Sequence, residues 1–235
     1  MKAVRLRTEF LNNPIGIDIR KPCLYWNDEE GITQSAYQLI AKVNGIESWD
    51  SGKVISSSMR CVWNGPTLKS RDEVEWKVRL WNEKDEAGAW TSARFEMGLL
   101  EKNDWQAKWI TGDYVPKTKR KLLRAYTGGK AERYPVDCFK KEFDSNTLSK
   151  ARLYITACGL YEAHLNGKRV GDFIMAPGYT DYPKRVQYQT YDVTELLKDG
   201  NNEITVMLAD GWYRGATGAW GLLCEYGYET KVLVQ

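Results

Sequence analysis

The 235-residue sequence predicts an all-β protein made of two antiparallel β-sandwiches in tandem. Short runs of alternating apolar and polar side chains recur along the chain, as in strands that bury one face. Turn dipeptides such as Asn44-Gly45 and Asn166-Gly167 separate several of these runs. The chain is too long for one small sandwich, and its length suits two domains of ordinary size.

Residues 1–100 are predicted to form the first sandwich, of immunoglobulin or fibronectin type. The clearest strand covers residues 73–82, where apolar and charged side chains alternate. The apolar ones share one face of that strand: Val74, Trp76, Val78 and Leu80. A half-buried antiparallel strand has this pattern. Similar patterns between turn signals predict further strands at residues 3–8, 22–26, 35–43, 55–62 and 91–99.

Residues 101–134 are predicted to link the two domains. The segment DWQAKWITGD at 104–113 carries two tryptophans four residues apart, which fits an amphipathic turn or an apolar strap. Between residues 114 and 134 there are seven basic residues and one acid, which indicates an exposed, solvated loop. The whole chain has a formal net charge of only +3, so the remainder is mildly acidic. A nucleic-acid-binding protein would instead arrange its basic residues along one folded face.

Residues 135–235 are predicted to form the second sandwich. Its first strand is expected at residues 139–143. The next apolar residues have one parity, with Gly159 between them as a bend or bulge: Leu153, Ile155, Ala157, Tyr161, Ala163 and Leu165. Asn166-Gly167 predicts a type I′ hairpin turn, which needs a positive φ at both positions.

A helix is predicted after this hairpin, and a strand follows it. The sequence DVTE at 192–195 fits a helix start capped by Asp192, and Gly200 suits the position just past its end. The alternation of the following strand places three residues on one face: Ile204, Val206 and Leu208. The chain stops inside an apolar strand-like run, KVLVQ, so we expect the second sandwich to be incomplete at its C-terminus.

The sequence offers little catalytic chemistry. Asp181 and Asp210 are the best carboxylate pair that can be assembled, and nothing in the sequence places them at the roughly 5–10 Å that glycoside hydrolysis requires. His164 is the single histidine, which excludes a two-histidine metal site, and it is read as a strand residue beside a hairpin. Serine-nucleophile, P-loop and dinucleotide motifs are absent.

Cysteine usage and the N-terminus favour a reducing compartment. The five cysteines are widely spaced, lack a C-x-x-C pair and are odd in number, which argues against a zinc site or a disulfide framework. The first residues, MKAVRLRTEF, lack the apolar core of a signal peptide. No window approaches the roughly 20 apolar residues of a membrane span. A cytoplasmic protein without membrane contact is therefore predicted.

A loop that follows directly on a strand is suited to sugar contact. Residues 209–221, ADGWYRGATGAWG, offer a carboxylate, an arginine, three aromatic rings and four glycines. An aromatic ring can cover the apolar face of a sugar, while a carboxylate or a calcium ion takes the hydroxyls. Glycines allow backbone carbonyls to approach such an ion. The chain is also rich in amphipathic rings, with ten Trp and fourteen Tyr.

Residues 151–220, the stretch WDSGKV at 49–54 and the DWQAKWI segment together resemble the N-terminal region of bacterial α-L-rhamnosidases of glycoside hydrolase family 78. The resemblance implies a fibronectin III-like first domain, a connecting strap and a jelly-roll-like second domain. It also implies a parent enzyme that releases terminal L-rhamnose with inversion. The catalytic acids of that enzyme would lie on an (α/α)6 barrel outside this chain, which therefore contributes none.

The resemblance also implies a sugar site, because the rhamnosidase sandwich includes a carbohydrate-binding module that holds L-rhamnose with calcium in some members. The matching residues would be Asp210, Trp212 and Tyr213, with Tyr179 and Asp181 from APGYTDY at 176–182, and Asp210 would be the calcium ligand. The same residues could instead pack against the barrel. A stand-alone lectin-like module and a structural or adhesive sandwich pair remain alternatives. No cofactor other than this calcium is expected.

Overall fold

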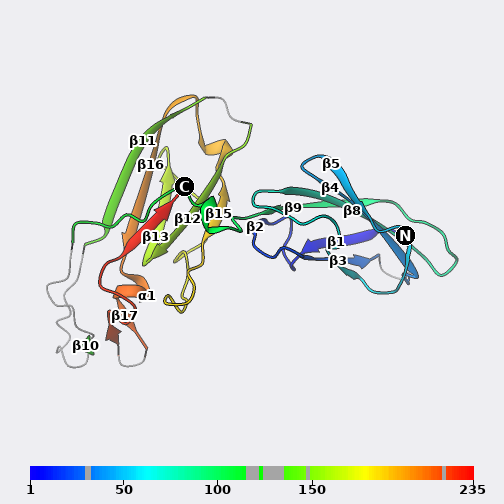
Figure 1. The fold of residues 1–235 in the computed structure, drawn as a ribbon, viewed down its shortest axis with the longest axis horizontal. Helices are drawn as coiled ribbons and strands as arrows, with labels where there is room; N and C mark the ends of the chain where they lie inside the picture. Colours follow the sequence, from blue (N-terminus) through cyan, green and yellow to red (C-terminus); the bar gives the residue numbers. More distant parts are fainter. Residues whose placement is uncertain (30–32, 115–121, 124–134, 147–148, 219–220) are drawn as a thin grey trace. The chain divides into compact units, whose positions relative to one another are not determined.

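The computed structural model describes residues 1–29, 33–114, 122–123, 135–146, 149–218 and 221–235. The chain divides into two compact units, Met1–Asp104 and Trp105–Gln235, and β-strands are the main regular elements of both (Figure 1). The predicted all-β class is confirmed. Most of the predicted basic loop, at residues 115–121 and 124–134, lies outside the described residues. No helix among those described is long and apolar enough to cross a membrane.

The first unit contains two sheets. One has the order β1-β3-β7, and the other has the order β2-β9-β8-β4-β5 with β6 also paired to β4. Strand β2 runs parallel to β9, whereas the other strand pairs of this unit are antiparallel. The elements are β1 (Ala3–Thr8), β2 (Ile15–Ile17), β3 (Cys23–Asp28), β4 (Ala36–Val43), β5 (Ile46–Asp50), β6 (Val54–Ile55), β7 (Arg60–Val62), β8 (Glu73–Trp81), β9 (Thr91–Met97) and the 3-10 turn η1 (Lys102–Asp104).

The prediction of one continuous strand at residues 55–62 is wrong. Strand β6 pairs with β4 in one sheet, and β7 pairs with β3 in the other, so the chain crosses the sandwich between them. The buried amide of Gln34 holds this crossing. Its Nε2 donates to the carbonyl oxygens of Ser56 at 2.8 Å and Ser58 at 2.9 Å, and its Oε1 accepts from Trp26 Nε1 at 2.8 Å.

The core of the first unit lies between its two sheets. The predicted apolar face of β8 is buried, as the alternation requires. On the outer face, cations and rings alternate in a stack. Arg79 lies 4.7 Å from the ring centroid of Trp81 and 4.8 Å from that of Trp90. Lys53 Nζ lies 5.0 Å from the Trp81 centroid, and Lys77 Nζ lies 4.8 Å from the Trp90 centroid. Such contacts stabilise a half-exposed sheet face without a second apolar layer.

The second unit also contains two main sheets, ordered β11-β16-β13-β14 and β15-β12-β19, and a small sheet ordered β10-β18-β17. The named strand pairs of this unit are antiparallel. The elements are β10 (Leu122–Leu123), β11 (Asp137–Ser145), β12 (Arg152–Cys158), β13 (Leu160–Leu165), β14 (Lys168–Arg169), β15 (Gln189–Asp192), the 3-10 turn η3 (Thr194–Leu196), β16 (Gly200–Ala209), the single helical turn α1 (Gly211–Arg214), β17 (Ala216–Thr217), β18 (Leu222–Leu223) and β19 (Lys231–Val234).

Gly159 marks the point where the chain of the second unit passes from one sheet to the other. It lies between β12 and β13, which belong to different sheets, and the apolar residues predicted to share a parity on both sides are buried in one core. Its φ is 140°, and a Cβ there would lie 2.5 Å from the carbonyl oxygen of Ala209. The Asn166-Gly167 hairpin is confirmed, with φ values of 51° and 77°.

The helix predicted after Asp192 is reduced to the single 3-10 turn η3. Asp192 Oδ1 does accept hydrogen bonds from the backbone N–H of Thr194 at 3.1 Å and from its hydroxyl at 2.7 Å. The turn cannot lengthen, because the buried side chain of Asn202 binds the backbone of the returning chain at Lys198 and at Gly200, where β16 begins.

The tryptophan-containing strap is an extended edge segment and not an amphipathic turn. Ile110 and Val232 exchange backbone hydrogen bonds of 3.0 and 2.9 Å, which adds the strap to strand β19. The Trp105 ring packs edge-on against Tyr188 at 5.4 Å and Tyr154 at 6.5 Å. The strap is thereby fixed to the second unit.

Candidate functional site

The predicted sugar loop begins at the end of β16 and forms the turn α1. Gly211 has a φ of 52°, and a Cβ there would lie 2.6 Å from Leu160 Cγ, so the turn requires glycine at this position. The Arg214 side chain turns back and is only 1 % exposed. Its Nε and Nη2 lie 2.7 and 2.6 Å from Asp210 Oδ1, and its Nη1 donates to the Tyr228 carbonyl oxygen at 3.5 Å.

Five aromatic rings gather beside this turn and are called here the aromatic cluster: Tyr179, Tyr182, Trp212, Tyr213 and Tyr226. Tyr179 meets Trp212 edge-on at a centroid distance of 5.9 Å. The hydroxyls of Tyr179 and Tyr226 are 2.5 Å apart. Tyr182 lies 5.0 Å from Tyr226 and 5.1 Å from Tyr213. The cluster is therefore one continuous set of ring contacts drawn from three separate stretches of chain.

The structure thus joins the three predicted aromatic residues, Tyr179, Trp212 and Tyr213, through two that the sequence did not single out as ligands. Tyr182 belongs to the APGYTDY segment that was predicted to contribute to the site, so its place in the sequence could have indicated its role. Tyr226 lies 47 positions after Tyr179, and its contact depends on the tertiary fold. Gly227 permits the packing here, because a Cβ at that position would lie 2.2 Å from the Tyr213 hydroxyl.

The phenols of Tyr182, Tyr213 and Tyr226 stay protonated at neutral pH. The hydrogen bond with Tyr179 raises the pKa of Tyr226 to about 12, and burial raises the pKa of Tyr182 to about 12. Burial also raises the pKa of Tyr213. The Tyr182 hydroxyl is buried and has no hydrogen-bond partner among the described residues. Tyr179 is 56 % exposed, so the cluster extends from the interior to the surface.

The acids that were predicted to bind sugar or metal are engaged by cations of their own loops. Asp181 Oδ2 lies 2.9 Å from Lys184 Nζ, and Asp210 is the counter-ion of Arg214. Calcium takes six to eight oxygen ligands. The described residues contain no group of three or more histidine, cysteine, aspartate or glutamate side chains that could hold a metal. With its carboxylate turned to a guanidinium, Asp210 does not fit the role of a calcium ligand.

Nor do these acids and His164 form a catalytic pair. Asp181 and Asp210 each neutralise a different cation. His164 Nε2 lies 3.3 Å from Glu162 Oε1, and the other oxygen of Glu162 lies 3.2 Å from Arg169 Nε. The histidine is therefore part of a partly exposed charged group on β13 and β14. This agrees with its interpretation as a strand residue beside a hairpin.

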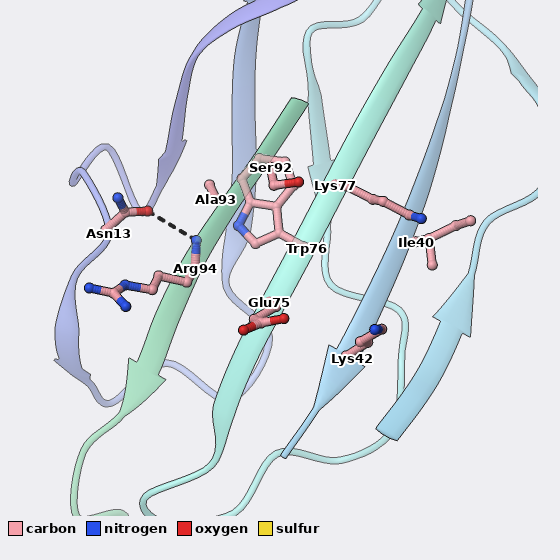
Figure 2. A pocket seen from close by; sticks show the side chains of 9 residues that line it. All are labelled: Asn13, Ile40, Lys42, Glu75, Trp76, Lys77, Ser92, Ala93 and Arg94. Carbon is pink, nitrogen blue, oxygen red and sulfur yellow. Dashed lines mark hydrogen bonds between the residues drawn. The ribbon is translucent and has the colours of Figure 1, made fainter. Parts of the chain in front are cut away.

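A groove of about 460 Å³ lies on the first unit, along strands β4, β8 and β9 (Figure 2). Glu75 is the single carboxylate in its lining, and it stands across the strands from Lys42 and Arg94. Asn13 Oδ1 accepts a hydrogen bond from the backbone N–H of Arg94 at 3.0 Å (Figure 2). Glycoside hydrolysis usually requires two carboxylates, so this groove is not a glycosidase site.

The two units define a tandem β-sandwich protein whose second unit carries the aromatic cluster. Comparison with known families names this class. Residues 3–101 match the family model described as the Rha78A-like N-terminal immunoglobulin domain, and residues 146–235 match the α-L-rhamnosidase N-terminal domain. The chain carries the N-terminal region of the α-L-rhamnosidase family.

Individual relatives agree with the family models. An α-L-rhamnosidase of Formosa agariphila is 39 % identical over 227 residues, which cover 90 % of this chain and 23 % of the relative. The structure of native α-L-rhamnosidase from Aspergillus terreus matches with a TM-score of 0.83 and 32 % identity, over 99 % of this chain and 26 % of that one. The chain spans about a quarter of the length of its curated relatives.

A third similarity concerns the fold alone. The crystal structure of Streptomyces avermitilis α-L-rhamnosidase, complexed with L-rhamnose, has a TM-score of 0.85 to this chain at 23 % identity. The match covers all of this chain and 39 % of that one. The all-β fold predicted from the sequence is therefore similar to the fold of this rhamnosidase structure.

Proposed function

We propose that this chain is the non-catalytic, accessory region of an enzyme that hydrolyses terminal α-L-rhamnose from glycosides or polysaccharides, and that its aromatic cluster holds a rhamnose unit. Single displacement with inversion would take place on a catalytic barrel domain of the same protein. The relatives support the enzyme over a stand-alone lectin or an adhesive sandwich pair, because all four curated relatives are named α-L-rhamnosidase and are several times longer.

One observation carries the sugar-binding part of the proposal. Trp212 and Tyr179 pack edge-on, and the hydroxyls of Tyr179 and Tyr226 beside them can donate and accept hydrogen bonds. Aromatic rings suit sugars because they cover apolar C–H faces and leave the hydroxyls to polar partners. The buried, unpartnered Tyr182 hydroxyl supports the proposal, since burying such a group without a partner costs about 1–3 kcal/mol.

A second role, packing on the catalytic barrel, is favoured by a different surface. Phe173, Ile174 and Met175 form an apolar run with exposed fractions of 49 %, 75 % and 50 %. Contiguous exposed apolar side chains typically mark interaction sites. We assign barrel contact to this run and sugar contact to the aromatic cluster, so the two roles can be separated by mutation.

Isothermal titration of L-rhamnose into the 235-residue chain tests the proposal. We expect binding that Trp212→Ala abolishes and that Phe173→Ser leaves unchanged. Because the described residues around Asp210 do not fit calcium, we expect the same binding in chelator. We also expect no release of nitrophenol from a nitrophenyl α-L-rhamnoside. Absence of binding by a folded chain, or equal binding by Trp212→Ala, would contradict the sugar site.

A further inference from the structure

A second hollow of the first unit adjoins the groove at Glu75. It has a volume of about 360 Å³, and its lining shares Asn13, Ser92 and Ala93 with that of the groove. The two hollows together are called here the basic groove, because cations from both linings gather in it: Arg5, Arg7, Lys42, Lys77 and Arg94. Among the described residues, Glu75 is the single carboxylate that lines either hollow.

A β-bulge in strand β1 turns the two arginines of the second hollow outward. The β1–β3 register shifts ahead of Arg7, and Arg5 has a φ of 51°. Ala3 is buried, so strict alternation would also bury Arg5 and Arg7. Instead Leu6 and Thr8 are buried, and both arginines are exposed. Bulges commonly re-aim side chains beside functional sites, and this one holds two cations on the groove.

Two of the five cations have contacts within the chain that do not neutralise them. Arg7 Nη1 donates a hydrogen bond to the Phe10 carbonyl oxygen at 3.2 Å. Lys77 Nζ lies 4.8 Å from the ring centroid of Trp90. A carbonyl group and an indole ring carry no net charge, so both cations keep their full positive charge and still attract an anion.

The carboxylates that face these cations are too few to balance them. Glu75 stands opposite both Lys42 and Arg94 across the strands (Figure 2). Glu47, which lies outside the lining, also stands opposite Lys42. Five cations and these two carboxylates leave a net charge of +3. The basic groove therefore suits an anionic ligand, and its two hollows suit one with anionic groups at more than one position.

The neutral groups of the basic groove favour a saccharide as the carrier of these anionic groups. Asn13 and Ser92 are exposed where the two hollows meet, and an amide and a hydroxyl can both bind sugar hydroxyls. Trp76 is the single ring that the described residues contribute to either lining, and it is only 1 % exposed. Proteins that bind single-stranded nucleic acid instead stack the bases on exposed rings.

We propose that the basic groove binds an anionic polysaccharide, whose carboxylate or sulfate groups meet the cations of the two hollows. The choice of a glycan rests on the proposed function, since an accessory region of a rhamnose-releasing enzyme works on rhamnose-bearing chains. The first unit thereby retains the enzyme on an acidic polysaccharide, independently of rhamnose binding at the aromatic cluster.

Titrations of the 235-residue chain with polygalacturonate and with dextran sulfate test the inference, and neutral dextran is the uncharged probe. We expect at least one polyanion to bind, dextran not to bind, and binding to weaken as salt is added. Arg5→Gln and Arg94→Gln, one in each hollow, should each weaken binding about tenfold, the loss expected from one charge-assisted hydrogen bond. Glu75→Gln should strengthen binding, which a folding defect would not do. Lys84→Gln removes an equal charge at an exposed position outside both linings and is the matched control.

Three results overturn the basic groove. They are no binding of either polyanion, a loss in Lys84→Gln equal to that in Arg5→Gln and Arg94→Gln, and tighter binding of oligothymidylate than of both polysaccharides. Binding of polygalacturonate alone supports the inference and identifies the anion as a carboxylate, whereas binding of dextran sulfate alone supports it and identifies a sulfate.

The outcomes also separate this inference from the proposed function. Rhamnose binding that is lost in Trp212→Ala and kept in Arg94→Gln supports the aromatic cluster, whatever the polyanions do. Polyanion binding that depends on Arg94 in a chain that does not bind rhamnose supports the basic groove and contradicts the cluster assignment.

Discussion

The guanidinium of Arg214 is buried against the carboxylate of Asp210, with Nε 2.7 Å from Oδ1, across the single helical turn that follows strand β16. A buried cation needs its counter-ion, because removing one partner of a buried pair leaves an uncompensated charge. Asp210 thus has a structural role at the position where a calcium ligand was predicted. The Trp212 ring is positioned by a turn that this ion pair supports.

Asp210→Ala is therefore expected to destabilise the chain whether or not a sugar is bound. We expect a loss of about 2–3 kcal/mol in the free energy of unfolding, below the usual range for fully buried pairs because the Asp210 side chain is 29 % exposed. Urea denaturation of the second unit measures it. Asp181→Ala is the control, since its exposed pair with Lys184 should contribute under about 1 kcal/mol. Equal stability of the two variants would contradict the structural role.

The buried side chain of Asn202 is expected to be the most sensitive polar position of the second unit. Its amide nitrogen donates to Ser145 Oγ and to the carbonyl oxygens of Lys198 and Gly200, and its oxygen accepts from Asn166 Nδ2 and from the Lys198 amide. Asn202→Ala should cost about 3 kcal/mol or more, because several buried groups lose their partners at once. Chemical denaturation with the exposed neighbour Asn201→Ala as control, expected within about 0.5 kcal/mol, measures the difference.

Two glycines are expected to respond differently to a methyl group. Gly159→Ala places a Cβ 2.5 Å from the Ala209 backbone oxygen at a φ of 140°, so both contact and conformation are unfavourable. A Cβ at Gly167 has no atom within 4 Å, and the φ there is 77°. Gly167→Ala should therefore lose only the cost of the left-handed conformation, about 1–2 kcal/mol in the free energy of unfolding. Thermal unfolding should show a clearly larger loss for Gly159→Ala. A larger loss at Gly167 would contradict the sheet crossing at Gly159.

Alkaline pH should weaken the second unit in a predictable window. Tyr226 keeps its proton to a pKa of about 12 in the folded chain, whereas an unfolded tyrosine loses it near a pKa of about 10. The folded state then binds more protons, so this stabilisation is complete below pH 10 and disappears as the pH rises through 12. Tyr179→Phe removes the hydrogen bond and should lower the Tyr226 pKa, which absorbance titration of phenolate detects. An unchanged Tyr226 pKa in the variant would exclude this hydrogen bond.

Several elements were predictable because their causes are local. The parity of apolar residues on both sides of Gly159 follows from strand geometry, and the Asn166-Gly167 turn follows from its requirement for positive φ. The split of residues 55–62 into β6 and β7 was not predictable from alternation, because the crossing is fixed by Gln34, which is distant in sequence. The reduction of η3 likewise depends on the buried amide of Asn202.

The aromatic cluster was predicted only in part, because some of its contacts are local in sequence and others depend on the tertiary fold. Residues 176–182 and 209–221 carry visible concentrations of rings, whereas the hydroxyl contact of Tyr179 with Tyr226 joins positions that only the fold brings together. The pairing of Asp210 with Arg214 did leave a signal, since the two stand four apart as helical ion pairs do. Because no helix was predicted at this position, the four-residue spacing was not interpreted as an ion pair.

Chemical-shift mapping of L-rhamnose binding locates the sugar site on the folded chain. The chain is labelled with nitrogen-15, and sugar is added to millimolar concentration. We expect a shift of the Trp212 indole N–H and of the Tyr179 and Tyr226 amides, with the groove at Glu75 in the first unit unaffected. No shift at Trp212, or shifts confined to the first unit, would contradict a rhamnose site at the aromatic cluster.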